Sequence, residues 1–91
     1  MRHLHYDLGV VPAGTAVRFN LNGTAANTIV VDDLNYQRYK TGQRFQYVGV
    51  HATKSPVRVN VPRTARWHAV VDLGGRGGRV NASVSVVGGR S

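Results

Sequence analysis

The sequence contains no cysteine and no glutamate, and its acidic residues are four aspartates in 91 positions. Without cysteine the chain forms no disulfide bond and offers neither a thiolate metal ligand nor a thiol nucleophile. No apolar run approaches the roughly 20 residues that a membrane-spanning helix needs. The N-terminal stretch M-R-H-L-H-Y-D-L has no apolar signal core, so we expect a cytoplasmic protein that does not bind membranes. The length predicts one domain, at residues 1–87, with a frayed tail at 88–91.

The charge balance is strongly basic. Twelve basic residues, ten of them arginine, stand against four acids and give a formal net charge of +8. Such a surface attracts anions, so the expected partner is an anionic small molecule, an acidic protein surface or nucleic acid. Arginine also presents a planar donor group that matches phosphate and carboxylate. The alternative is a soluble arginine-rich surface without a binding role, since the arginines are scattered along the chain.

Apolar and polar residues alternate through nearly the whole chain. This period of two is typical of strands with one buried face, as in A-V-R-F-N-L-N-G at residues 16–23. The run T-I-V-V-D-D at 28–33 is apolar without alternation and predicts a central strand. Together these segments predict an all-β protein, an antiparallel β-sandwich of about seven short strands. The side chains expected in its core are Leu4, Tyr6, Val17, Phe19, Leu21, Ile29, Val57, Val59, Val61, Trp67, Val71, Val84 and Val86.

The middle of the chain is less regular. Tyr36 and Tyr39 lie three positions apart, which is compatible with one helical turn or a long loop. R-F-Q-Y-V-G-V at 44–50 alternates again and places Phe45 and Tyr47 on one face of a strand. No helical period is long enough to predict a regular helix.

Several short motifs follow one another in a recognisable order. They are H-Y-D-L at residues 5–8, A-A-N at 25–27, N-Y-x-x-Y-x-x-G at 35–42, Y-x-G at 47–49, S-P-V at 55–57 and W-H-x-V-V-D-x-G-G at 67–75. In this order and spacing the chain, from about His3 to Val86, resembles the bacterial family called domain of unknown function 1883. The resemblance implies a small β-sandwich domain, found alone or fused to TIR domains of bacterial immunity, and it implies no reaction or ligand. The chain departs from the family pattern at Val50, where a second glycine would follow Gly49.

The segment from Asn35 to His51 is the main candidate site. It interleaves aromatic rings with basic side chains, which stack on and neutralise a nucleotide or single-stranded nucleic acid. Binding residues also tend to lie on irregular segments above a rigid scaffold. The alternative is that the tyrosines only cover the open end of the sandwich, with their hydroxyls in water. The candidate ligand-binding residues are Tyr36, Arg38, Tyr39, Arg44, Tyr47 and His51.

The stretch D-L-G-G-R-G-G-R-V at 72–80 is a second candidate. A phosphate-binding loop precedes a helix, whereas the segment that follows here alternates like a strand. RNA-binding Arg-Gly-Gly tracts are repeated, and this chain has one copy. We therefore interpret the stretch as a hairpin loop in which glycines supply positive φ, with Arg76 and Arg79 at its tip as anion contacts.

The histidines raise the alternative of a metal site. His3 and His5 share one strand face, and His51 and His68 would complete a set if the fold brought them near. No spacing links these pieces, so we predict neither a metal ion nor another cofactor. His68 and Asp72 also share a face but are separated by about 13 Å along one strand, too far for a catalytic pair.

These observations favour a non-enzymatic recognition or sensor module of bacterial defence or signalling, which binds an anionic ligand or an acidic partner surface. Through the family resemblance, a TIR-domain protein is a further expected partner. One alternative is a sequence-independent nucleic-acid-binding protein, driven by the net charge. The other is a metal-dependent enzyme that uses the histidines.

Overall fold

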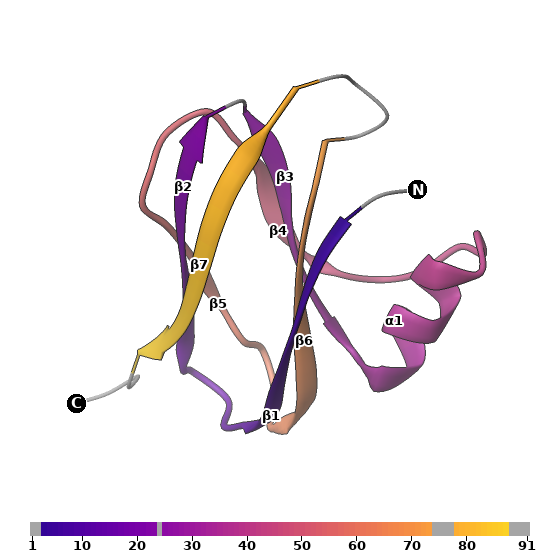
Figure 1. Ribbon diagram of the computed structural model, residues 1–91. Coiled ribbons are helices and arrows are strands. Elements are labelled where there is room, and N and C mark those ends of the chain that lie inside the picture. The colour runs from indigo at the N-terminus through magenta and orange to yellow at the C-terminus, as the bar shows by residue number, and fades with distance from the viewer. Residues whose placement is uncertain (1–2, 24, 74–77, 88–91) are drawn as a thin grey trace.

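In the computed structural model, which describes residues 3–23, 25–73 and 78–87, seven strands form two antiparallel sheets with one short helix beside them (Figure 1). Sheet A has the spatial order β1 (His3–Val11), β6 (Ala65–Asp72), β3 (Ala26–Asp32) and β4 (Val48–Ala52). Sheet B has the order β5 (Val57–Asn60), β2 (Ala16–Gly23) and β7 (Val80–Val87). The helix α1 (Asp33–Lys40) follows β3 directly. The antiparallel β-sandwich expected from the alternation is thereby confirmed.

The core lies between the sheets and is built from the inward positions of the alternating strands. Val17 and Phe19 of β2 are fully buried and belong to one hydrophobic cluster with Val30 and Ala69 of sheet A. Removing such side chains from water contributes roughly 25 cal/mol per Å² of apolar surface. The expected core is confirmed for the buried residues Val17, Phe19, Val59, Val61, Trp67 and Val71, and Tyr6, Leu21, Val57 and Val84 pack partly buried against it.

Two residues expected in the core are exposed instead. Leu4 is 39% exposed and Val86 is 45% exposed. Both point to the inner side, because they lie directly opposite the buried Val71 and Val17. However, β1 and β7 are the outermost strands of their sheets, so no further strand covers their flanks. Alternation indicates which face of a strand a side chain lies on, but it does not indicate whether the strand is central or at the edge of its sheet.

The outer face of sheet A is also covered. There α1 packs on the sheet (Figure 1). Ile29, Val31, Val70 and Tyr36 form a second buried cluster between them. Ile29 is therefore buried, although on the face opposite to the sandwich core. Strand β3 lies between β6 and β4 and is buried on both faces, which confirms the central strand expected from its continuous apolar run.

Residues 33–40 form a regular helix, longer than the single turn or loop expected. The side chain of Asp32 caps it by accepting from the backbone N–H of Asn35 at 2.9 Å. Arg38 and Lys40 lie in the last turn, where positive charge is favourable for the helix dipole. No helix of the described residues is long and apolar enough to cross a membrane. The strand expected over residues 44–50 begins only at Val48.

The glycine-arginine stretch is not a hairpin loop. Strand β6 pairs with β1 and β3 in sheet A, whereas β7 pairs with β2 in sheet B. Both edges of β6 are therefore occupied, and the chain must cross from one sheet to the other between Asp72 and Val80. Residues 74–77, including Arg76, lie outside the described residues.

Candidate functional site

Each strand of sheet A contributes one polar residue to a single row across the outer face. The pairing places His3 opposite Asp72, and Asp72 opposite Asn27. Asn27 in turn lies opposite His51 on β4. Directly opposite residues of antiparallel strands share a face, and neighbouring strands lie about 4.8 Å apart. Strand pairing thus brings residues from four distant parts of the sequence onto one line.

Asp72 orients the two polar groups that follow it in the row. Nδ2 of Asn27 donates to Oδ1 of Asp72 at 3.0 Å. This leaves Oδ1 of Asn27 as an acceptor, which lies 2.9 Å from Nδ1 of His51. Because a carboxylate only accepts, the direction of both bonds follows from Asp72. His51 therefore carries a proton on Nδ1, and Nε2 of the neutral ring is an acceptor.

Tyr39 reaches Asp72 from the helix. Its hydroxyl donates to Oδ2 of Asp72 at 2.8 Å, so both oxygens of this buried carboxylate are hydrogen-bonded. Burial raises the pKa of Tyr39 well above its usual range, and the bond to Asp72 raises it further. The phenol consequently stays protonated and keeps its role as a donor.

A pocket of about 420 Å³ opens beside this row, within the size range of small-molecule sites. Its aromatic side is a series of ring contacts, with centroids 5.3 Å apart between Tyr39 and Phe45 and 5.3 Å apart between Phe45 and Tyr47. Tyr47 is 55% exposed, so part of its ring is accessible to a ligand. The polar side of the pocket comes from the row and contains Asn27, His51 and Asp72.

Gly49 lets β4 lie close to β3 beside this pocket. A Cβ atom added there would lie 1.9 Å from the carbonyl oxygen of Thr28, and the φ of Gly49 is +152°. Only glycine tolerates both conditions. The next residue, Val50, is 53% exposed and lines the pocket. The residue at which a second glycine was expected is therefore one of those that line the candidate site.

Tyr36 attaches α1 to the histidines of the outer face. Its buried ring stacks on His5 with centroids 4.2 Å apart and on His68 with centroids 4.8 Å apart. Nζ of Lys40 lies 5.0 Å from the ring centroid, and the hydroxyl lies 3.3 Å from Nε2 of His3. Other side chains of the protein thus cover the ring of Tyr36, so Tyr47 is the more accessible stacking surface.

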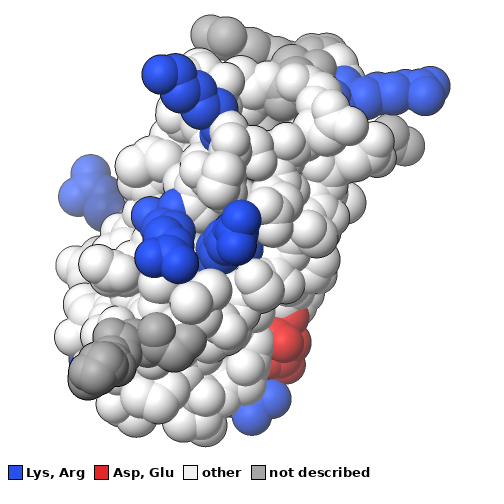
Figure 2. Space-filling model, turned by 90° about the vertical axis from the view of Figure 1, so that its left-hand side faces the viewer, with Lys and Arg blue, Asp and Glu red and all other residues white. Residues whose placement is uncertain are grey.

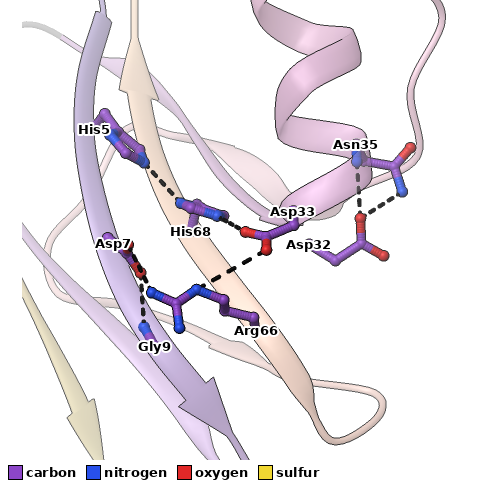
Figure 3. A network of polar contacts seen from close by, with 8 residues as sticks. All are labelled: His5, Asp7, Gly9, Asp32, Asp33, Asn35, Arg66 and His68. Atoms are coloured by element: carbon purple, nitrogen blue, oxygen red, sulfur yellow. Dashed lines mark hydrogen bonds and ion pairs between the residues drawn. The ribbon is translucent and has the colours of Figure 1, made fainter.

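A chain of polar contacts joins β1, β6 and the start of α1 (Figure 3). Nε2 of His5 lies 2.8 Å from Nδ1 of His68, whose Nε2 donates to the carboxylate of Asp33. Arg66 connects two carboxylates, with nitrogens 3.9 Å from an oxygen of Asp33 and 3.2 Å from an oxygen of Asp7. Burial lowers the pKa of His5, and the neighbouring imidazoles lower it further. These contacts hold the helix against the sheet.

The structure brings three predicted site residues together in the pocket. Tyr39 comes from α1, Tyr47 from the segment before β4, and His51 from β4. Arg44 is exposed and directly precedes Phe45, a residue of the pocket wall. The predicted alternative for the tyrosines, hydroxyls in water, does not describe Tyr39, whose hydroxyl is bound to the protein.

The other predicted basic residues lie elsewhere. Arg38 is exposed and two positions from Tyr36, which places it on the side of α1 away from the sheet. Arg79 lines a second hollow, of about 480 Å³, together with His3 and Leu4. Arg76 lies outside the described residues.

Seven residues of the pocket were not among the predicted ligand-binding residues: Asn27, Thr28, Ile29, Phe45, Gly49, Val50 and Asp72. Their signal in the sequence is weak. Asn27 and Asp72 are polar residues at outward positions of strands whose other residues are almost all buried. Their proximity depends on β6 lying beside β3, which no spacing in the sequence reveals.

The four histidines fall into two places. His3, His5 and His68 contact Tyr36, whereas His51 lies at the far end of the polar row. In the part of the chain that the structure describes, no group of three or more His, Cys, Asp or Glu side chains is arranged to hold a metal ion.

The comparisons with known proteins concern the chain as a whole. A family model described as "Domain of unknown function (DUF1883)" matches residues 1–90. Searches of curated proteins and of solved structures found no significant match. The matched range includes both sheets, α1 and every residue of the pocket. It also agrees with the resemblance carried by the ordered motifs, and the chain therefore belongs to the DUF1883 family.

Proposed function

We propose that this domain is a non-enzymatic recognition module whose pocket binds a small planar ligand that carries negative charge, or the corresponding acidic group of a partner protein. One observation carries the proposal. Tyr39, Tyr47 and His51 come from three different segments and meet in a single pocket of about 420 Å³. Convergence of a few polar groups on an aromatic pocket is characteristic of ligand sites.

The aromatic wall supports a planar ligand. The ring of Tyr47 is accessible and is backed by Phe45, which is in turn backed by Tyr39. Stacking of a base on such a ring contributes about 1–3 kcal/mol. His51 offers the ligand edge an acceptor at Nε2 when neutral and a donor when protonated. A nucleotide-like molecule combines these properties with negative charge.

The charge of the surroundings supports an anion. The chain has a net charge of +8, and the exposed Arg44 is next to the aromatic wall. Asp72 is the acidic residue that lines the pocket, and Tyr39 and Asn27 already donate to its two oxygens. Its charge is thereby partly offset before a ligand arrives.

Hydrogen bonding in the pocket supports binding and not catalysis. The hydroxyl of Thr28 donates to the backbone oxygen of Val50 at 2.8 Å, so it is not paired with a base that would activate it. Asp72 holds Asn27 and Tyr39 in place, which is the role of an orienting group. The family resemblance supports the wider setting of this proposal, a protein of bacterial defence or signalling that associates with TIR-domain proteins. A cytoplasmic location is part of the same proposal.

The test is a titration of the protein with nucleoside mono- and diphosphates, with inorganic phosphate as a probe of charge alone and with an acidic peptide. We expect a nucleotide to bind more tightly than phosphate. Tyr47→Ala should weaken its binding by about 1–3 kcal/mol through lost stacking. Arg44→Ala should weaken it by about 1.5–3 kcal/mol through a lost charge-assisted hydrogen bond.

Arg38→Ala is the matched control, because it removes the same charge from the side of α1 that faces away from the sheet. Its effect should be small and should fade in salt. Equal losses for Arg38→Ala and Arg44→Ala would show that net charge, and not the pocket, determines binding. Loss of binding in Arg79→Ala, with Arg44→Ala intact, would place the site at the second hollow.

A further inference from the structure

Acidic side chains are distributed unequally over the two sheets. All four acidic residues of the chain belong to the side of sheet A and α1, namely Asp7, Asp32, Asp33 and Asp72. Strands β2, β5 and β7 of sheet B contain no acidic residue, yet β2 carries Arg18 and β5 carries Arg58. Sheet B therefore has positive charge that none of its own strands compensates.

The two arginines form a cross-strand pair. Arg18 lies directly opposite Arg58, and both point outward because the flanking Val17 and Phe19 are buried in the core. Within the described ranges neither arginine takes part in an ion pair, and the buried Nε of Arg18 has no hydrogen-bond partner. Like charges in this position are unfavourable. An anion between the two guanidinium groups would relieve that repulsion.

Most side chains around the pair are small and polar. Ser85 lies opposite Arg18, and Ser83 lies opposite Asn20 on the same strand pair. Phe19, the single aromatic residue of these three fully described strands, is buried. On the side of the molecule where sheet B lies, basic side chains are spread over the surface, and acidic atoms are visible only near one lower edge (Figure 2).

We propose that the outer face of sheet B binds the sugar–phosphate backbone of double-stranded nucleic acid. Arg18 and Arg58 contact phosphates, and the nearby serine and asparagine side chains donate to phosphate and sugar oxygens. Such contacts provide half or more of the hydrogen bonds in protein–DNA complexes and do not read the base sequence. The face lies on the side of the molecule opposite α1 (Figure 1), so this inference is independent of the proposed pocket.

The chemistry of the face favours a duplex over other polyanions. Binding of single strands relies on exposed aromatic rings that stack on bases, and the strands of sheet B offer none. Binding at a membrane surface relies on apolar side chains that insert between lipids. Most outward neighbours of the arginine pair, such as Ser85, Ser83 and Asn20, are polar instead, and Ala16 is buried.

The experiment measures fluorescence anisotropy of a labelled mixed-sequence duplex of about 20 base pairs with the full chain, between about 50 and 200 mM salt. We expect the affinity to fall steeply with salt and to be the same for unrelated sequences. Arg58→Gln should weaken binding about tenfold at low salt and reduce the salt slope by about one. Arg18→Gln should act in the same way, and the double variant should lose more.

Arg38→Gln is the charge-matched control, since it lies on α1, and it should change the affinity far less. Tyr47→Ala should leave duplex binding unchanged, which separates this inference from the proposed pocket. Arg58 is exposed, so its variant decides the question even if Arg18→Gln fails to fold. Three results would overturn the proposal: equal losses for Arg38→Gln and Arg58→Gln, tighter binding of the matching single strand, or binding of phosphatidylserine–phosphatidylcholine vesicles but not of the duplex.

Discussion

Val59 illustrates how a single position reports the register of its strand. It is buried in the core cluster, while its neighbours Arg58 and Asn60 are exposed. A shift of one residue would exchange these environments and place both polar side chains inside. The energetic cost of shortening Val59 therefore tests the arrangement of sheet B.

We expect Val59→Ala to lower the free energy of unfolding by about 1–3 kcal/mol, because it removes buried methyl groups and leaves a partial cavity. Denaturant unfolding measures the change. Val86→Ala removes the same atoms from a side chain that is 45% exposed, and it should cost clearly less. A cost near zero for Val59→Ala would contradict the register described for β5.

At the level of elements, α1 is held by two kinds of contact. Its first turn is fixed by the cap at Asp32 and by the bond from His68 to Asp33. Its middle is fixed by Tyr36, which stacks on His5 and His68. Imidazole rings take part in both attachments. We therefore expect the protonation of these histidines to change the strength with which α1 packs on sheet A.

His5 makes the stability depend on pH. Partial burial lowers its pKa from the ordinary 6.5, the positive charges of His68, His3 and Lys40 lower it further, and Asp7 opposes this. The folded state therefore binds fewer protons than the unfolded chain just below pH 6.5. The contribution of His5 is fully present above that value and is lost as the pH falls through the lowered folded-state pKa.

We expect the Tm to be lower at about pH 5 than at about pH 7.5, and we expect His5→Asn to reduce this difference. Thermal unfolding followed by circular dichroism at both pH values is the measurement. The hydrogen bond from the Gly9 backbone lowers the pKa of Asp7, so that carboxylate titrates below this window. An unchanged pH dependence in His5→Asn would refute the assignment to His5.

At the scale of the whole molecule, charge divides the protein into two surfaces. The side of sheet A and α1 holds every acidic residue together with the aromatic pocket, whereas sheet B presents arginine, serine and asparagine. We therefore propose different anions for the two surfaces, a small planar ligand for the pocket and an extended phosphate backbone for the outer face of sheet B.

Whether the fold depends on a bound metal ion can be tested directly. We expect that a chelator leaves the Tm unchanged and that protein purified without chelator contains no stoichiometric zinc. The test is informative because a structural metal would contribute to the folding free energy, so its removal would lower the Tm. Thermal unfolding with and without chelator, combined with elemental analysis, tests this. A drop in Tm on chelation would restore the histidines His3, His5, His51 and His68 as candidate ligands.

The alternation of side chains was sufficient to predict the sandwich and most of its core. The inward positions of β2, such as Val17 and Phe19, follow from a local property, because successive side chains of a strand point to opposite faces. A different signal, aromatic rings interleaved with basic side chains in the less regular segment from Asn35 to His51, identified Tyr39, Tyr47 and His51 as candidate residues. Alternation identified none of these three. It was wrong about the burial of Leu4 and Val86, since the order of strands in a sheet is not a local property.

Tertiary structure decided the rest. The row from His3 through Asp72 and Asn27 to His51 exists because β6 and β3 lie between β1 and β4. The same long-range pairing sends the chain after Asp72 across to sheet B instead of into a hairpin. Hydrogen bonds between distant strands set these neighbours, and a period of two residues carries no information about which strands will pair.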